Sequence, residues 1–199
     1  AHVTGVIANL TSIVRCAGTL IIASEFKAAQ FLHLAARERV TFTAMVPAMY
    51  NLCLLQADLT AYDLSAWRIG GYGGAPMPTA NIEKVARALP NLQLFHCYGA
   101  TETSSPSAIL PAKFAASHID SVGFACPGAR IVAIDPSGRE LPADEVGELW
   151  IHGGSIVKGY WNNPSATTES FTAGYWHSGD LGSVDKDGCV RVFDRAKDM

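Results

Sequence analysis

Apolar and polar positions follow two different periods in the first half of the chain. Segments with apolar residues three and four positions apart, the spacing of one helix face, separate short runs rich in β-branched and aromatic residues. The predicted helices are Val3–Val14, Phe26–Arg39, Met49–Gln56 and Pro78–Leu89. The predicted strands are Thr19–Ala23, Val40–Val46, Trp67–Gly70 and Leu92–His96. Strands that alternate with helices in this way predict an α/β fold, in which helices flank a mostly parallel sheet.

The pattern changes in the second half, where short strands replace the helical periodicity. The predicted strands are Ala129–Asp135, Glu148–His152, Trp176–Val184 and Cys189–Phe193. The last two flank an Asp-Lys-Asp-Gly sequence, which is typical of a hairpin turn. We therefore predict an α/β subdomain over residues 1–121 and a smaller antiparallel β-sheet or barrel-like subdomain over residues 122–193.

Two loops of the first half follow predicted strands at their carboxyl ends, where parallel sheets bind ligands. The first loop is Gly70–Pro76, which begins with four glycines in five positions. Glycines let a backbone approach a ligand closely, although this segment alone slightly favours an ordinary tight turn between strand and helix. The second loop is Tyr98–Glu102. Because both loops lie at strand ends, we predict that they share one ligand site.

The second loop combines three chemical groups. The Tyr98 ring can stack on a base, the Thr101 hydroxyl can donate to a phosphate, and the Glu102 carboxylate can hold a divalent cation. The alternative is that Thr101 only caps a helix. Further along the chain, Asp180 is either a turn residue or a carboxylate that accepts hydrogen bonds from two neighbouring hydroxyls, as in ribose recognition.

Composition narrows the classes of partner. The chain is 49% hydrophobic and has a formal net charge of −3, which gives no electrostatic reason to expect nucleic acid or an anionic membrane. No apolar run reaches the roughly 18 residues of a membrane span. The five cysteines are odd in number and none are spaced as C-x-x-C, so we expect buried reduced thiols in a cytoplasmic protein, without disulfides or zinc.

Taken together, these segments resemble the adenylate-forming superfamily, which includes acyl-CoA synthetases, peptide-synthetase adenylation domains and beetle luciferases. The similarity covers essentially the whole chain, and the segments occur in the family's order. Ser178 stands where the family usually has Thr, and it keeps the hydroxyl. The matching segments are Ala1–Gly5, Gly73–Pro76, Tyr98–Glu102, Gly147–Leu149 with Gly153, Lys158–Trp161, Pro164 with Thr167, Ser178–Leu181 and Asp194–Asp198.

The resemblance implies where ATP or AMP would bind. Tyr98 would lie against adenine, and Gly74 and Ala75 would form the opposite wall. Asp180 would hold both ribose hydroxyls, and Arg195 would reach the ribose or the phosphate. The complete implied nucleotide-binding set is Gly73, Gly74, Ala75, Pro76, Tyr98, Gly99, Asp180 and Arg195.

The resemblance also implies catalytic and substrate positions. Thr101 would hydrogen-bond the α-phosphate, and Glu102 would bind Mg²⁺. Residues 194–199 would begin the hinge to a mobile C-terminal domain. The implied acyl-pocket residues are His2, Gly99 and Ala100, and the implied hinge residue is Lys197.

By this resemblance, the chain belongs to an ATP-dependent acid–thiol ligase, an AMP-forming acyl-CoA synthetase of fatty acid metabolism. The expected partners are a small carboxylic acid with an uncharged acyl or aryl tail, ATP and coenzyme A, and a homodimer is compatible with the sequence. Two alternatives stay open: an adenylation domain that loads a carrier protein, and a non-catalytic nucleotide-binding module.

The chain begins at Ala1 rather than Met. The family's phosphate loop and its lysine-bearing C-terminal domain match no segment of the sequence. We therefore expect an internal piece of the enzyme that is inactive on its own.

Overall fold

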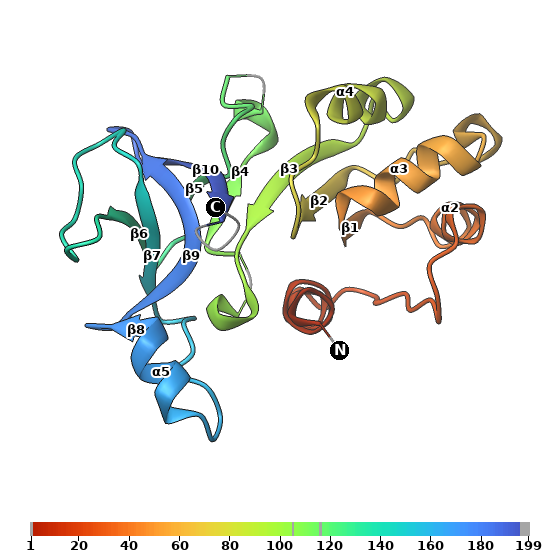
Figure 1. Ribbon diagram of the computed structural model, residues 1–199. Coiled ribbons are helices and arrows are strands. Elements are labelled where there is room, and N and C mark those ends of the chain that lie inside the picture. Colours follow the sequence, from red (N-terminus) through yellow and green to blue (C-terminus); the bar gives the residue numbers. More distant parts are fainter. Residues whose placement is uncertain (1, 105, 116, 196–199) are drawn as a thin grey trace. The chain divides into compact units, whose positions relative to one another are not determined.

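Residues 2–104, 106–115 and 117–195 are described by the computed structural model (Figure 1). The chain divides into two compact units, residues 1–96 with 111–115 and residues 97–110 with 116–199. The predicted subdomain boundary after residue 121 stays a prediction.

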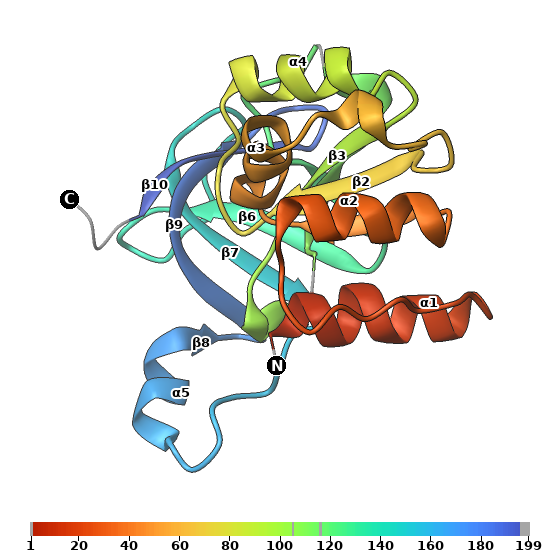
Figure 2. The ribbon, with the colours of Figure 1, turned by 90° about the vertical axis from the view of Figure 1, so that its right-hand side faces the viewer.

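The first unit is built on parallel strands with helices alongside them (Figure 2). Strand β1 (Phe42–Met45) pairs in parallel with β2 (Ile69–Gly73), and β3 (Gln93–Tyr98) follows β2 in the sheet order. The helices are a π-helix at Thr4–Thr11, α1 (Ser12–Arg15), α2 (Ala28–Arg37), α3 (Pro47–Gln56), α4 (Thr79–Ala88) and short 3₁₀ turns at Leu59–Ala61 and Ala112–Phe114. This arrangement confirms the predicted α/β class.

Two aromatic residues in the core of the first unit hydrogen-bond to its buried polar groups. Trp67 is 2% exposed and stacks on Tyr50, with ring centroids 6.1 Å apart. The Trp67 indole donates to Thr43 Oγ1 (3.1 Å), and the Tyr50 hydroxyl donates to the Gly71 carbonyl (3.0 Å). A Cβ on Gly70 would lie 2.8 Å from the Tyr50 hydroxyl. Gly70 therefore leaves room for the hydroxyl of the buried Tyr50, which a larger residue would contact too closely.

The second unit is antiparallel, and its strands follow the order β4-β5-β10-β9-β7-β6, with β8 beside β9. Alternate residues of β6 and β7, such as Ile131, Leu149 and Ile151, contribute to its buried core together with residues of β4, β9 and β10. The strands are β4 (Ala108–Leu110), β5 (Gly123–Ala125), β6 (Ala129–Ile134), β7 (Gly147–Gly153), β8 (Phe171–Thr172), β9 (Tyr175–Val184) and β10 (Cys189–Arg195), with helix α5 (Pro164–Ser170) and a 3₁₀ turn at Thr101–Thr103. The predicted antiparallel second half and its β9–β10 hairpin are confirmed.

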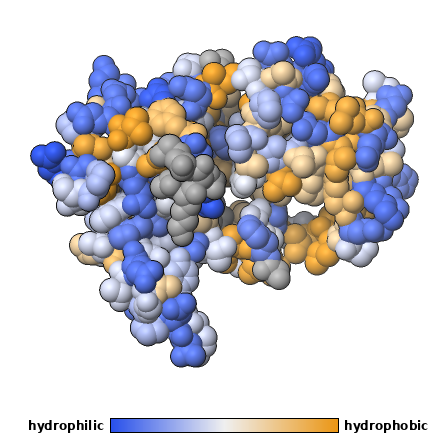
Figure 3. All heavy atoms as spheres, in the orientation of Figure 1, coloured by the Kyte–Doolittle hydropathy of each residue, from blue (hydrophilic) through white to orange (hydrophobic). Residues whose placement is uncertain are grey.

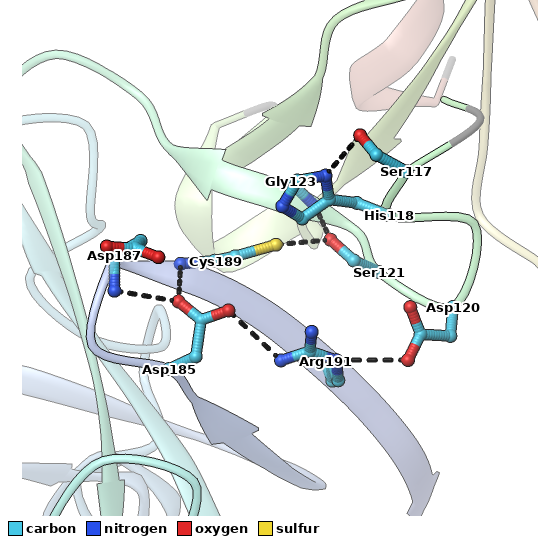
Figure 4. A network of polar contacts seen from close by, with 9 residues as sticks. All are labelled: Ser117, His118, Asp120, Ser121, Gly123, Asp185, Asp187, Cys189 and Arg191. Atoms are coloured by element: carbon cyan, nitrogen blue, oxygen red, sulfur yellow. Dashed lines mark hydrogen bonds and ion pairs between the residues drawn. The ribbon is translucent and has the colours of Figure 1, made fainter. Parts of the chain in front are cut away.

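A polar network ties this hairpin to the segment before β5 (Figure 4). Arg191 on β10 donates to Asp120 Oδ2 (3.0 Å) and to Asp185 Oδ2 (3.2 Å). Ser121 Oγ lies 2.9 Å from the buried Cys189 thiol. Burial disfavours the Asp185 carboxylate, but hydrogen bonds from the Cys189 amide and from Arg191 outweigh it, so the pKa of Asp185 is lower than usual.

Three expectations from the sequence are wrong. Thr19–Ala23 is not a strand, and Ile22 is 80% exposed, because no described strand pairs with this segment and its backbone has no ladder partner. The glycines from Gly70 to Gly73 lie within β2 rather than in a loop. Of the five cysteines, which are free thiols in the structure, only Cys53 and Cys189 are buried; Cys97 and Cys126 are partly buried and Cys16 is exposed.

Apolar side chains remain at the surface of the first unit, interspersed with polar ones on the face in Figure 3. Such residues occur singly on most proteins and need no function of their own. They are Val6, Leu10, Val14, Ile22, Val46 and Leu55. Among the described residues, none of the helices has the length and apolar character needed to cross a bilayer.

Candidate functional site

The carboxyl end of β3 leads directly into a tight turn that displays two candidate residues. Tyr98 closes the strand, and its carbonyl accepts the Ser107 amide at 2.7 Å. The fully buried Thr103 fixes the turn, because its hydroxyl accepts from the Ala100 amide (3.0 Å) and donates to the Ala100 carbonyl (2.9 Å). Thr101 is thereby exposed as the first residue of the 3₁₀ turn; Ala100, not Thr101, stands at the cap position.

Two candidate residues meet at the carboxylate of a third, and each of the three comes from a different strand. The Tyr98 hydroxyl donates to Asp180 Oδ2 at 2.6 Å, and Arg195 Nε donates to Asp180 Oδ1 at 3.0 Å. The Asp180 side chain is only 13% exposed, whereas that of Arg195 is 65% exposed. Strands β3, β9 and β10 thus bring together an aromatic ring, an acid and a base that are far apart in the sequence.

The electrostatics of this group fix which atom donates. Burial, followed by the neighbouring Asp180 carboxylate, raises the pKa of the Tyr98 phenol, so the phenol stays protonated and is the donor. An ionised carboxylate has about four lone-pair sites. Asp180 therefore keeps acceptor capacity after binding Tyr98 and Arg195, and this capacity suits a pair of hydroxyl donors.

Glu102 is held separately, by a residue that the sequence did not single out for a role. Tyr160 donates its hydroxyl to Glu102 Oε1 at 2.9 Å, and the Glu102 carbonyl accepts the Val157 amide at 2.9 Å. The second carboxylate oxygen of Glu102 has no hydrogen-bond partner among the described residues. Its place in the Lys158–Trp161 motif is the one signal that could have identified Tyr160.

The donor set around Glu102 fits a magnesium ion bound together with phosphate. The described part of the chain contains no group of three or more His, Cys, Asp or Glu residues that could hold a metal by themselves. Mg²⁺ commonly uses one or two carboxylates and completes its shell with water and substrate phosphates. One half-buried carboxylate with an oxygen available matches that pattern.

The remaining candidate residues lie in the first unit, at other positions of the second unit, or outside the described residues. Gly73 ends β2, and Gly74–Pro76 follow it as exposed residues of the first unit. His2 is exposed in the same unit, with Nδ1 3.2 Å from Thr4 Oγ1. Gly99 is exposed, and Ala100 packs on the core of the second unit. Lys197 lies outside the described residues.

A family model described as AMP-binding enzyme matches residues 1–161. The chain belongs to this family. Among curated AMP-binding relatives, a feruloyl-CoA synthase of Amycolatopsis sp. is 36% identical over 92% of this chain and 37% of its own length. A fatty acid–[acyl-carrier-protein] ligase of Streptomyces coeruleorubidus is 35% identical over 92% of this chain and 36% of its own length.

Solved structures of AMP-binding enzymes have the same fold. The o-succinylbenzoate coenzyme A synthetase of Bacillus subtilis, in complex with ATP and magnesium ion, superimposes with a TM-score of 0.89 at 29% identity, covering 100% of this chain and 40% of that one. The amide bond synthetase McbA of Marinactinospora thermotolerans gives a TM-score of 0.84 at 29% identity, covering 90% of this chain and 36% of that one. The fold is that of the adenylate-forming enzymes, and the chain spans well under half the length of these relatives.

Proposed function

We propose that this chain supplies the AMP-binding part of an ATP-dependent acid–thiol ligase. The observation that carries the proposal is the convergence of Tyr98 and Arg195 on the Asp180 carboxylate, within a chain of the AMP-binding family. Asp180 would accept both ribose hydroxyls of ATP or AMP, and the exposed guanidinium of Arg195 would reach the ribose or phosphate. Tyr98 would lie against adenine. The nucleotide-binding role of Gly73–Pro76, which belong to the first unit, stays a prediction.

The proposed chemistry requires positioning more than acid–base catalysis. A carboxylate oxygen of the substrate attacks the α-phosphorus of ATP. The bond between this phosphorus and pyrophosphate breaks, pyrophosphate leaves, and an acyl-adenylate remains. A thiolate then attacks the acyl carbon, and AMP leaves with the electron pair of the broken bond. Thr101 would donate its hydroxyl to the α-phosphate, and Glu102 would hold Mg²⁺, which when bound neutralises phosphate charge in the transition state.

The acid and the acceptor are proposed from the relatives' names and the sequence. Relatives include a feruloyl-CoA synthase and 4-coumarate–CoA ligases, whose names specify aryl acids and coenzyme A. We propose an uncharged acyl or aryl acid beside Gly99 and Ala100, and coenzyme A as the thiol. A role for His2 of the first unit stays a prediction. A cytoplasmic location, a homodimer and a hinge at Lys197 stay predictions.

One observation favours a second acceptor. The relative from Streptomyces coeruleorubidus is named as a ligase of fatty acids to acyl carrier protein. A carrier-protein thiol in place of coenzyme A would leave the nucleotide site unchanged, so the two acceptors differ only in the second half-reaction. Comparing transfer to coenzyme A with transfer to a pantetheinylated carrier protein distinguishes them.

The nucleotide site is tested by calorimetric titration of AMP into the protein and its Asp180→Ala variant. We expect Asp180→Ala to weaken AMP binding by about tenfold or more, since a hydrogen bond to a charged group contributes about 1.5–3 kcal/mol. The matched control is Asp187→Ala, which removes an exposed carboxylate from the β9–β10 turn and leaves the affinity unchanged. Equal AMP affinity of Asp180→Ala and the unaltered protein would contradict the proposed site.

A further inference from the structure

Strand β9 contains an irregularity at the position from which Asp180 projects. Opposite β7, Glu148 pairs with Leu181 and Trp150 pairs with His177. Between these pairs β7 has the single residue 149, whereas β9 has residues 178, 179 and 180, so β9 carries two extra residues. Such a bulge interrupts the ladder and redirects side chains.

A bulge of this size leaves backbone amides without their usual ladder acceptors, and side chains replace them. The Gly179 amide donates to Glu148 Oε1 at 3.0 Å, and the Asp180 amide donates to Ser178 Oγ at 3.0 Å. Gly179 has φ of 71°, the left-handed region that favours glycine. Glu148 thus holds the residue directly before Asp180 through the backbone.

The Glu148 carboxylate is itself oriented from its own strand. Trp150, two residues on and on the same face of β7, donates its indole N–H to Glu148 Oε2 at 2.9 Å. The Trp150 ring stacks on His177, with centroids 3.9 Å apart and an interplanar angle of 15°. One oxygen of Glu148 is thereby fixed by Trp150, and the other is aimed at the bulge.

Ion pairing does not account for the position of the Glu148 carboxylate. Across the described ranges, no lysine, arginine or histidine nitrogen forms an ion pair with Glu148. Both of its contacts are with N–H donors that belong to the bulge or to the residue opposite the bulge's start. The two oxygens of Glu148 therefore serve to hold two N–H groups in place. A glutamine could not do this in the same way, because its side chain has one acceptor oxygen in place of two.

We propose that Glu148 is the positioning residue for the ribose-binding carboxylate Asp180. By holding the Gly179 amide, it sets the direction in which the Asp180 side chain leaves the bulge, while Tyr98 and Arg195 hold its far end. This inference rests on the proposed function, because it assumes that Asp180 binds the ribose hydroxyls. Glu148 touches no nucleotide atom in this scheme and acts only through the backbone of the bulge.

Two nucleotides separate a positioning role from a general effect on folding. AMP presents both ribose hydroxyls, whereas 2′,3′-dideoxy-AMP presents neither and gains nothing from a well-placed Asp180. We expect Glu148→Gln to weaken AMP binding by about five- to tenfold and to leave 2′,3′-dideoxy-AMP binding within about twofold. Glu140→Gln removes an exposed carboxylate elsewhere in the second unit and is expected to change neither affinity.

The outcomes distinguish failure of the inference from failure of the proposed function. If Glu148→Gln weakens both nucleotides equally, or neither, the positioning role is refuted. If the unaltered protein does not bind AMP, or if Asp180→Ala leaves its preference for AMP over the dideoxy analogue unchanged, the proposed nucleotide site is refuted as well.

A second measurement needs no nucleotide. Hydrogen exchange of the Gly179 amide, followed by NMR, reports the bond to Glu148 directly. We expect exchange at least about tenfold faster in Glu148→Gln than in Glu140→Gln, with β9 residues such as Ser183 unchanged. Equal Gly179 exchange in the two variants would overturn the proposal whatever the nucleotide affinities show.

Discussion

Single residues of the candidate site are held by partners with no obvious connection to them in the sequence. Asp180 is bound by Tyr98, which lies 82 positions before it, and Glu102 is bound by Tyr160, which lies 58 positions after it. In both pairs a phenol donates to a carboxylate. Each phenol holds its carboxylate in a fixed direction, which helps that carboxylate to recognise hydroxyls or a metal.

Replacing Tyr160 by Phe tests the support of Glu102. Loss of the 2.9 Å hydrogen bond frees the carboxylate to rotate, so we expect the apparent affinity for Mg²⁺ to fall by about three- to tenfold while AMP binding without metal is retained. The measurement is calorimetric titration of ATP at a series of Mg²⁺ concentrations.

The control for this prediction is Tyr175→Phe. It makes the same chemical change in the same unit, at a phenol with no hydrogen bond among the described residues. An unchanged Mg²⁺ dependence in Tyr160→Phe would show that the tyrosine does not support metal binding.

At the scale of elements, the β9 bulge and the turn after β3 display the candidate residues. The bulge interrupts a strand and the turn follows the end of one, so both are irregular backbone. Each is stabilised by a side chain that accepts a hydrogen bond from a backbone amide: Glu148 in the bulge and Thr103 in the turn. Sequence periodicity identifies the strands, but it contains no information on a register shift, because the shift depends on the partner strand.

The bulge makes a stability prediction at Gly179. Its φ of 71° strains any residue with a Cβ, although no atom lies within 4 Å of an added Cβ. Gly179→Ala should therefore lower the free energy of unfolding by about 1–2 kcal/mol, measured by urea denaturation. Gly154→Ala, where the space is equally open and φ is not positive, should change it by less than about 0.5 kcal/mol. Equal stabilities of the two variants would contradict the strained geometry.

At the scale of the molecule, the sequence and the structure agree on a parallel α/β unit and an antiparallel unit. The Gly-rich segment and His2 belong to the first unit, whereas Tyr98, Glu102, Asp180 and Arg195 belong to the second. The proposed adenylation chemistry therefore draws its ribose and Mg²⁺ contacts from the second unit. It also draws, by resemblance, on a phosphate loop and a catalytic lysine that match no segment here.

The prediction at this scale is that this chain alone does not catalyse adenylation. Because the chain spans 37% of the feruloyl-CoA synthase that it resembles, we expect no pyrophosphate release above background from ATP, Mg²⁺ and a panel of aryl and acyl acids. A coupled pyrophosphate assay measures it, with a full-length acyl-CoA synthetase as positive control. Rapid, acid-dependent release would contradict the expected inactivity and leave the nucleotide-binding proposal standing.

The sequence by itself determined the elements and the family. Apolar periodicity located the helices α2, α3 and α4 and the β9–β10 hairpin to within a few residues, because these depend on local spacing and turn chemistry. The ordered motifs identified the AMP-binding family without coordinates. The prediction failed at Thr19–Ala23, since a strand requires a neighbour and apolar composition does not supply one.

Only the tertiary structure decided how the side chains meet. The Tyr98–Asp180–Arg195 group, the support of Glu102 by Tyr160 and the grip of Glu148 on the bulge all join residues on different strands or turns. Their geometry follows from strand order and register, which are set by long-range pairing rather than by local sequence. The physical reason is that a hydrogen bond acts over about 3 Å of space, whatever the separation along the chain.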